Sequence, residues 1–197
     1  MALTVTHIAR EFSPSEAAAI TGVSVDQQRD WRRRDLLPAN VKGKWTRFTL
    51  NQIIEMSVMK TFSDAGFAVS SVTTCACMAV LPSLAIIHLL PSTVAFEGVE
   101  ISDEQKDGIR RGSVRRKGPG VDETADQIGG RYLVMTSDDS GTPSISRWDD
   151  LANLRQHLTD AKAIHCSILD CVQLANRIAE RAGLPLVRVE VEEAEGK

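Results

Sequence analysis

Seven cationic side chains lie close together near the start of the chain, and their chemistry suits phosphate oxygens. Segment 29–47 contains them beside only two carboxylates, Asp30 and Asp35. The cationic residues are Arg29, Arg32, Arg33, Arg34, Lys42, Lys44 and Arg47. The whole chain has a net charge of −3, but residues 1–73 hold nine Lys and Arg against seven Asp and Glu. Because nucleic-acid binding needs a local cationic face, the acidic total does not exclude it.

The four residues before this cluster have side chains that could contact base edges. They are Val25, Asp26, Gln27 and Gln28. A glutamine amide can form two hydrogen bonds with adenine, and an aspartate can accept one from cytosine. Each such residue taken alone is more often part of a solvated helix face. The chemistry therefore depends on the elements that carry these side chains.

Four cysteines offer a second kind of candidate chemistry. Cys75 and Cys77 are two residues apart, and Cys166 and Cys171 are five apart. On a helix the first spacing points the thiols to different faces, and the second converges poorly. Four cysteines in a chain of this length do not indicate a disulfide framework. We expect buried or partly buried thiols and neither a metal site nor a cofactor, with a cysteine-based metal or redox sensor as the alternative.

Other classes of function find little support in the sequence. No phosphate loop, nucleophile elbow or HExxH helix occurs, so we do not expect an enzyme. No run of about 18 apolar residues occurs, so we expect no segment to cross a membrane. Residues 1–10 lack the pattern of a secretory signal, and a cytoplasmic protein is the resulting expectation.

Two short helices joined by a tight turn are predicted to carry the candidate base-contacting residues. Ser13 can cap the first helix, with Pro14 at its first position and Glu16 completing a capping box. Gly22 suits the turn, because glycine tolerates the left-handed conformation. Ser24 can cap a second helix, running from residue 25 to about residue 34. This arrangement is the helix-turn-helix pattern.

A basic hairpin and two more helices are expected next. Segment 39–48 contains a Gly turn flanked by β-forming and basic residues, which predicts a short hairpin. Thr49 can cap a third helix, whose apolar stripe includes Ile53, Met56 and Phe62. Segment 64–66 should end it, and a fourth helix should begin near residue 69 or 70.

Segment 12–72 resembles the DNA-binding domain of the MerR family of transcription regulators. The matching motifs occur in the family's order and are Thr21-Gly22-Val23-Ser24, Arg29-Asp30-Trp31, Asp35-Leu36-Leu37-Pro38, Arg47-Phe48-Thr49 and Ala65-Gly66-Phe67. The resemblance implies a winged helix-turn-helix whose second helix lies in the major groove of DNA. It also implies that the hairpin, as the wing, contacts phosphates or the adjacent minor groove.

The resemblance names a set of DNA-contacting residues on the second helix and the wing. They are Ser24, Val25, Asp26, Gln27, Gln28, Arg29, Trp31, Arg32, Arg33, Lys42, Lys44, Trp45 and Arg47. Gln28 departs from the family, which usually has an apolar residue there, and Asp35 replaces a usual glycine. Pro82 and Pro91 also argue against the long coiled-coil helix that follows this domain in family activators.

The rest of the chain is predicted to form a connector and a small α+β unit. We expect a short apolar helix over 84–90 and a mobile basic linker over 110–120. The expected C-terminal elements are strands 131–136 and 144–147, a helix from about 148 to 158, a long helix over 160–182 and a strand over 186–192. The predicted domains are therefore 1–73, 74–130 and 131–197.

The long C-terminal helix offers a candidate dimer contact. Its small and apolar residues alternate in steps of three and four. They are Ala161, Ile164, Ile168, Cys171, Ala175, Ile178 and Ala182. This stripe could pair two subunits or cover the sheet of its own domain, and both interpretations stay open. Dimerisation is attractive because one helix-turn-helix makes few contacts for a specific site.

These expectations combine into one hypothesis. The fold class is mainly α with small β, comprising an N-terminal winged helix-turn-helix and a small α+β C-terminal unit. The expected function is a sequence-specific regulator of transcription that binds double-stranded DNA as a homodimer, with RNA polymerase as a further candidate partner. The alternative within DNA binding is a phage-type architectural protein, excisionase-like or involved in packaging.

Overall fold

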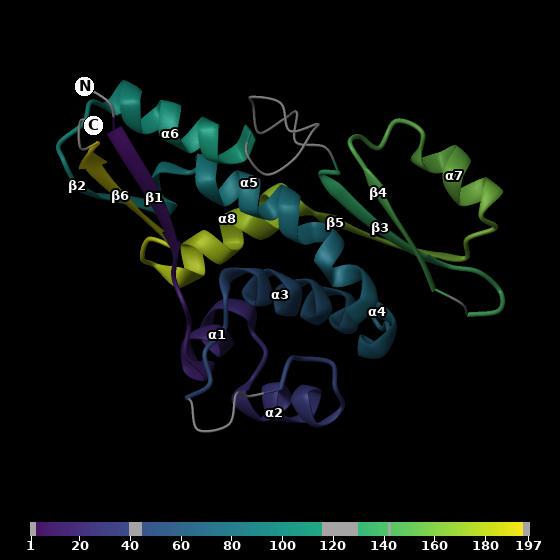
Figure 1. Cartoon of the computed structure of the whole chain (residues 1–197). Helices are drawn as coiled ribbons and strands as arrows, with labels where there is room; N and C mark the ends of the chain where they lie inside the picture. The colour runs from purple at the N-terminus through teal and green to yellow at the C-terminus, as the bar shows by residue number, and fades with distance from the viewer. Residues whose placement is uncertain (1–2, 40–44, 116–129, 142, 195–197) are drawn as a thin grey trace.

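The computed structural model describes residues 3–39, 45–115, 130–141 and 143–194. Its helices enclose one apolar core, and two three-stranded sheets lie beside them (Figure 1). The helices are α1 (Pro14–Thr21), α2 (Val25–Arg33), α3 (Leu50–Asp64), α4 (Val69–Ala76), α5 (Val80–Leu89), α6 (Asp103–Arg115), α7 (Leu154–Asp160) and α8 (Cys171–Ala182), with 3-10 turns η1 (Cys77–Ala79) and η2 (Pro91–Thr93).

The first sheet joins the two ends of the chain. Its strands are β1 (Leu3–Ala9), β2 (Val94–Gly98) and β6 (Val187–Glu193), in the order β1-β6-β2. Strand β6 is antiparallel to β1 and parallel to β2. The alternation predicted for its sequence is confirmed, since Val187, Val189 and Val191 are all buried while Arg188 is exposed.

The second sheet forms an arm that extends away from the first sheet, with α7 at its far end (Figure 1). Its strands are β3 (Tyr132–Ser137), β4 (Pro143–Trp148) and β5 (His165–Asp170), in the order β4-β3-β5 with antiparallel pairing throughout. The strand pair predicted over 131–147 is therefore confirmed. The predicted helix after it is shorter and later than expected, because α7 begins only at Leu154.

The helices α3, α5 and α8 form the centre of the core. Helix α5 is apolar on all sides, and Pro82 to His88 are all buried, as expected for a helix that is enclosed by others. It ends at Leu89, immediately before Pro91, as predicted from the proline. Helix α8 packs against α5 and α1, and Arg181 donates a hydrogen bond of 3.1 Å to the Ile20 carbonyl in α1. The helix-turn-helix segment is thus fixed to the body of the protein.

The long helix predicted over 160–182 is wrong. Segment 165–170 is strand β5, and α8 starts only at Cys171. Asp170 makes the break, because its carboxylate caps α8 by accepting hydrogen bonds from the Val172 and Gln173 amides. The same carboxylate pairs with Arg131 at 2.9 Å.

The continuous dimer stripe is therefore wrong as well. Ala161, Ile164 and Ile168 lie before α8 and are exposed. The members on α8 instead face the protein's own core, where Cys171, Ala175 and Ile178 are each at most 1 % exposed and Ala182 packs against the core. Of the two interpretations of this stripe, the α8 residues satisfy the one in which the helix covers its own domain.

The predicted linker and domain boundaries also change. Residues 110–115 of the expected basic linker belong to helix α6, and residues 116–120 lie outside the described residues. Strands from the three predicted domains form one sheet, because β1, β2 and β6 pair with each other. The boundaries after residues 73 and 130 consequently do not separate independent cores. No helix of the described ranges has the length and apolarity that crossing a bilayer requires.

The burial of Ile178 leads to a first prediction. Ile178→Ala should lower the free energy of unfolding by about 2–5 kcal/mol, since it opens a cavity in the core. Ile168→Ala, at a side chain that is 44 % exposed, should cost much less. Urea unfolding at two protein concentrations measures both. A loss for Ile178→Ala that appeared only at low concentration would instead indicate a subunit contact at this residue.

Candidate nucleic-acid interface

Helix α1 begins with the capping box that its sequence predicts. Ser13 Oγ accepts a hydrogen bond from the Glu16 amide, and Glu16 Oε2 accepts one of 2.8 Å from the Ser13 amide. These Ser13 hydrogen bonds, together with the ion pair to Arg10, lower the pKa of Glu16. The carboxylate therefore stays charged at neutral pH and holds the start of the helix.

The turn between α1 and α2 is fixed by side chains from both helices. Gly22 has φ 77°, the left-handed conformation that the tight turn requires. Thr21 Oγ1 donates to the Ala17 carbonyl at 2.7 Å and accepts from the Val23 amide at 3.1 Å. Gln28 Nε2 donates to the carbonyls of Pro14 at 2.9 Å and Val23 at 3.0 Å. This single amide ties the second helix to both the first helix and the turn.

The outward face of α2 presents polar and charged side chains. Asp26, Gln27, Arg29 and Arg33 are exposed. Gln27 also completes the cap of α2, because its Oε1 accepts a 3.0 Å hydrogen bond from the Ser24 amide. Its Nε2 is therefore the atom left to contact a base, since two-fold pairing with adenine uses both amide atoms. In this conformation Gln27 can supply one donor only.

Most arginines of α2 pair with aspartates of the same helix. Arg29 contacts Asp26 at 3.0 Å, and Arg33 contacts Asp30 at 2.5 Å. Arg34 lies 3.6 Å from the same Asp30, and the Arg33 hydrogen bond in particular lowers the pKa of that carboxyl. Exposed pairs of this kind contribute about 0–1 kcal/mol and exchange readily with other anions. They reduce the positive charge of the helix face until a phosphate displaces the carboxylate.

A backbone bridge holds segment 45–48 beside the start of α1. The Phe12 amide donates to the Phe48 carbonyl at 2.9 Å, and the Phe48 amide donates to the Phe12 carbonyl at 2.8 Å. Both rings are buried. The bridge places Trp45, which is 93 % exposed, and the exposed Arg47 on the surface next to α2.

Arg32 differs from the other arginines of α2 in its surroundings. Its guanidinium carbon lies 4.5 Å from the centre of the Phe48 ring, a cation–π contact. Its buried Nε has no hydrogen-bond partner among the described residues, and burial lowers its pKa. Arginine nevertheless stays protonated at neutral pH. A charged donor without an anionic partner is costly when buried, so this group favours an anion close by.

The Arg32 groove is a surface concavity beside this guanidinium, with a volume of about 430 Å³. Arg47, Thr49 and Gln52 line it together with Arg32, as does the carboxylate residue Glu11. The groove opens between α2, segment 45–48 and the start of α3. Two cationic side chains with a hydroxyl and an amide can bind the oxygens of a phosphate.

Comparison with known proteins identifies the segment that contains this surface. Residues 12–75 match the family model described as MerR HTH family regulatory protein. These residues form a MerR-type helix-turn-helix domain. The match starts at the Phe12 bridge and ends in α4, so it includes α2 and the Arg32 groove. A search of the curated proteins found no match to the chain.

Two of the contact residues predicted for the MerR-type domain have structural positions instead. Gln28 is fully buried in its hydrogen bonds to α1 and the turn, so it does not face a duplex. Trp31 is 5 % exposed and belongs to the core cluster, so it does not lie on the outer surface. Ser24 accepts from the Gln27 amide as the N-cap of α2, and Val25 is partly buried. Both corrections follow from the close crossing of α1 and α2.

The wing of the MerR-type domain is described only in part. Lys42 and Lys44 lie outside the described residues, together with the rest of segment 40–44. Trp45, Thr46 and Arg47 have no strand conformation, and Phe48 contributes the isolated bridge to Phe12. The expected hairpin therefore remains a prediction, whereas the surface positions of Trp45 and Arg47 agree with it.

The cysteines do not form a metal site within the described part of the chain. No group of three or more His, Cys, Asp or Glu residues suited to a metal ion occurs there. Burial raises the pKa of the Cys171 thiol to about 11 and also raises that of Cys166. Raised values leave little thiolate at neutral pH, and thiolate is the reactive and metal-binding form. These two thiols are poor candidates for a redox or metal sensor.

The hydrogen bonds of Gln28 predict a loss of stability rather than of sequence preference when it is replaced. Gln28→Met should lower the free energy of unfolding by about 1–3 kcal/mol, because two carbonyls lose their buried donor. Thermal unfolding measures this change. The matched variant Gln27→Met, at an exposed position, should lose less, and equal losses would contradict the structural role assigned to Gln28.

Proposed function

We propose that this protein is a transcription regulator that binds double-stranded DNA in a sequence-dependent way as a homodimer. The family match of residues 12–75 supports the DNA-binding part of the proposal. The observation that carries it is the desolvated Arg32 guanidinium, which lines a groove with Arg47 beside the exposed face of α2. In the proposed complex that face enters the major groove and a backbone phosphate occupies the Arg32 groove.

The division of labour on α2 follows from its contacts. Arg32 and Arg47 would hold the phosphate, and this contact sets affinity and register without regard to sequence. Gln27 and Asp26 would meet base edges from the exposed first turn of the helix. Arg29 and Arg33 would exchange their aspartate partners for neighbouring phosphates. Each of these steps uses a side chain that is accessible or lines an open groove.

Homodimerisation is proposed on physical grounds. A single helix-turn-helix contacts few base pairs, and dimers of this motif bind two half-sites related by symmetry. Among the residues first considered for the contact, Ile164 and Ile168 remain exposed, at 70 % and 44 %. Large exposed apolar side chains of this kind are available to a partner. Contact with RNA polymerase is proposed only as the usual requirement of a regulator that acts at promoters.

The phosphate assignment is tested by replacing two neighbouring arginines. Arg32→Gln should weaken binding to every duplex and lower the slope of log affinity against log salt by about one unit. Arg33→Gln is the matched control, because Arg33 already has Asp30 as a partner, and it should change the slope by about half a unit or less. Fluorescence anisotropy with duplexes over a range of salt concentrations gives both slopes. Equal effects of the two substitutions would contradict the special position of Arg32.

The sequence preference is tested by selection from a pool of random duplexes. The full chain should select sites with two half-sites related by two-fold symmetry. Gln27→Ala should change the preferred base at one position of each half-site, at a cost of about 1–3 kcal/mol in discrimination. Selection of single, unrepeated sites would exclude the homodimer, and an unchanged preference would exclude Gln27 as a base contact.

A further inference from the structure

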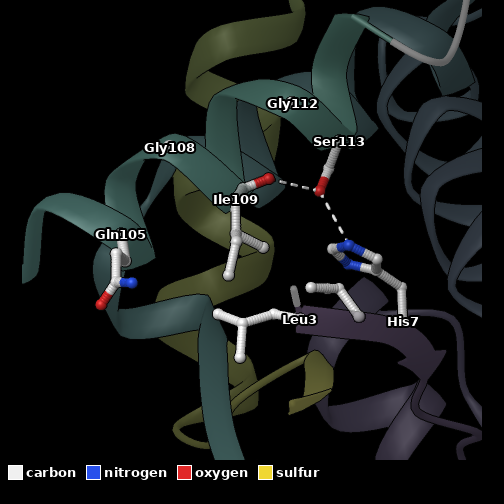
Figure 2. Close-up of a pocket in the computed structure, with 8 residues that line it drawn as sticks. Leu3, His7, Gln105, Gly108, Ile109, Gly112 and Ser113 are labelled. Carbon is white, nitrogen blue, oxygen red and sulfur yellow. Dashed lines mark hydrogen bonds between the residues drawn. The ribbon is translucent and has the colours of Figure 1, made fainter. Parts of the chain in front are cut away.

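Two neighbouring cavities lie between the first sheet and the helices, away from the exposed face of α2. One, of about 290 Å³, lies between β1 and α6 and has Leu3, Val5 and Ile109 in its walls (Figure 2). The other, of about 470 Å³, is bounded by β1, β6, α3, α5 and α6. His7 and Ser113 line both cavities. Their combined size falls in the range of small-molecule sites.

Polar side chains meet where the two cavities adjoin. Ser113 Oγ donates to the Ile109 carbonyl at 2.8 Å and lies 3.1 Å from His7 Nε2 (Figure 2). A serine hydroxyl has one hydrogen, and the Ile109 carbonyl takes it, so His7 Nε2 is the donor in the second bond. His88, which is 5 % exposed, packs edge-on against His7 with the ring centres 5.7 Å apart. Two imidazoles and a hydroxyl are thus grouped on an otherwise apolar wall.

The rest of the larger cavity is suited to an anion at the same end. The described lining residues of both cavities include no Asp, Glu, Lys or Arg. Thr49 and Leu50, at the start of the 15-residue helix α3, form part of the wall. Thr49 Oγ1 accepts from the Gln52 amide, which leaves its own hydrogen available to donate. The start of a helix also carries a partial positive charge.

Opposite this polar end the cavities are closed by apolar side chains. Leu84, Val187 and Ala9 line the larger cavity, and Leu3 and Ile109 line the smaller one. Gly108 and Gly112 of α6 leave room, since a Cβ added at either position would meet nothing within 4 Å. The space therefore suits a compact apolar body that carries one acidic group.

We propose that these cavities form a binding site for a small apolar carboxylic acid, with its carboxylate held by His7, His88 and Thr49. The imidazole and hydroxyl donors satisfy the carboxylate oxygens, and the apolar walls enclose the body of the ligand. The site is separate from the Arg32 groove, and its existence does not depend on the proposed function. It is therefore tested without DNA.

Binding is measured on the full chain with the fluorescent apolar anion 8-anilinonaphthalene-1-sulfonate and two isosteric competitors. Benzoate should displace the probe about tenfold better than benzamide, because only benzoate carries the anionic group. Equal displacement by the two competitors, or no saturable binding of the probe, would overturn the proposal. Circular dichroism and thermal unfolding verify that the probe reports on the folded protein.

Three variants link the binding to these cavities. His88→Leu should reduce the advantage of benzoate over benzamide to about threefold or less, since it removes a donor but keeps the apolar volume. Gly112→Leu, in an open helical position, should fold normally and weaken probe binding about tenfold by filling the smaller cavity. Leu81→Ala, on the exposed side of α5, is the control and should bind like the unaltered chain. Unchanged binding in both His88→Leu and Gly112→Leu would place the ligand elsewhere and overturn the proposal.

Discussion

The pairing of β6 with β1 and β2 is the constraint on which the arrangement of this protein depends. It brings the last described strand between a strand from the start of the chain and one from its middle. At Gly98 the backbone comes so close to β6 that any Cβ would collide with the Val191 carbonyl. Closing so long a loop costs entropy, but the cost grows only slowly with length. The sheet then holds α8 against α5, and α8 in turn contacts α1.

This constraint explains why the helix-turn-helix is a fixed part of the molecule. Helix α3 contributes its buried face to the common core, and α8 reaches the Ile20 carbonyl through Arg181. Within the domain, Gln28 and Thr21 use buried hydrogen bonds to hold the two short helices together. The exposed side of α2 therefore has a defined orientation, although the helix has only nine residues. An isolated helix of that length would be marginal in water.

Local signals in the sequence predict the first third of the fold well. The caps Ser13, Ser24 and Thr49 start helices where expected, and each forms its predicted type of hydrogen bond to the backbone. These signals work because a cap acts within a few residues of itself. Gln28 shows the limit of the approach, because its neighbours suggested exposure. Only the packing of α1 on α2 decides that its amide points inward.

Distant contacts decide what the sequence did not predict. Segment 165–170 continues the three-and-four spacing of α8, yet it pairs with β3 along its whole length. Strand β1 was missed because its partner β6 lies at the other end of the chain. Helix α6 was missed because its glycines and arginines are typical of a linker, although one face packs on α5. In each case tertiary contacts outweigh local preference.

The antiparallel register of β1 and β6 has a practical consequence for working with the protein. Leu3 lies opposite Glu193, so both ends of the described chain emerge at one corner, far from α2 (Figure 1). A purification tag, a fluorophore or a fused protein attached at either end would project from the side opposite the recognition helix. Immobilising the molecule through its ends would leave that helix facing outward into solution.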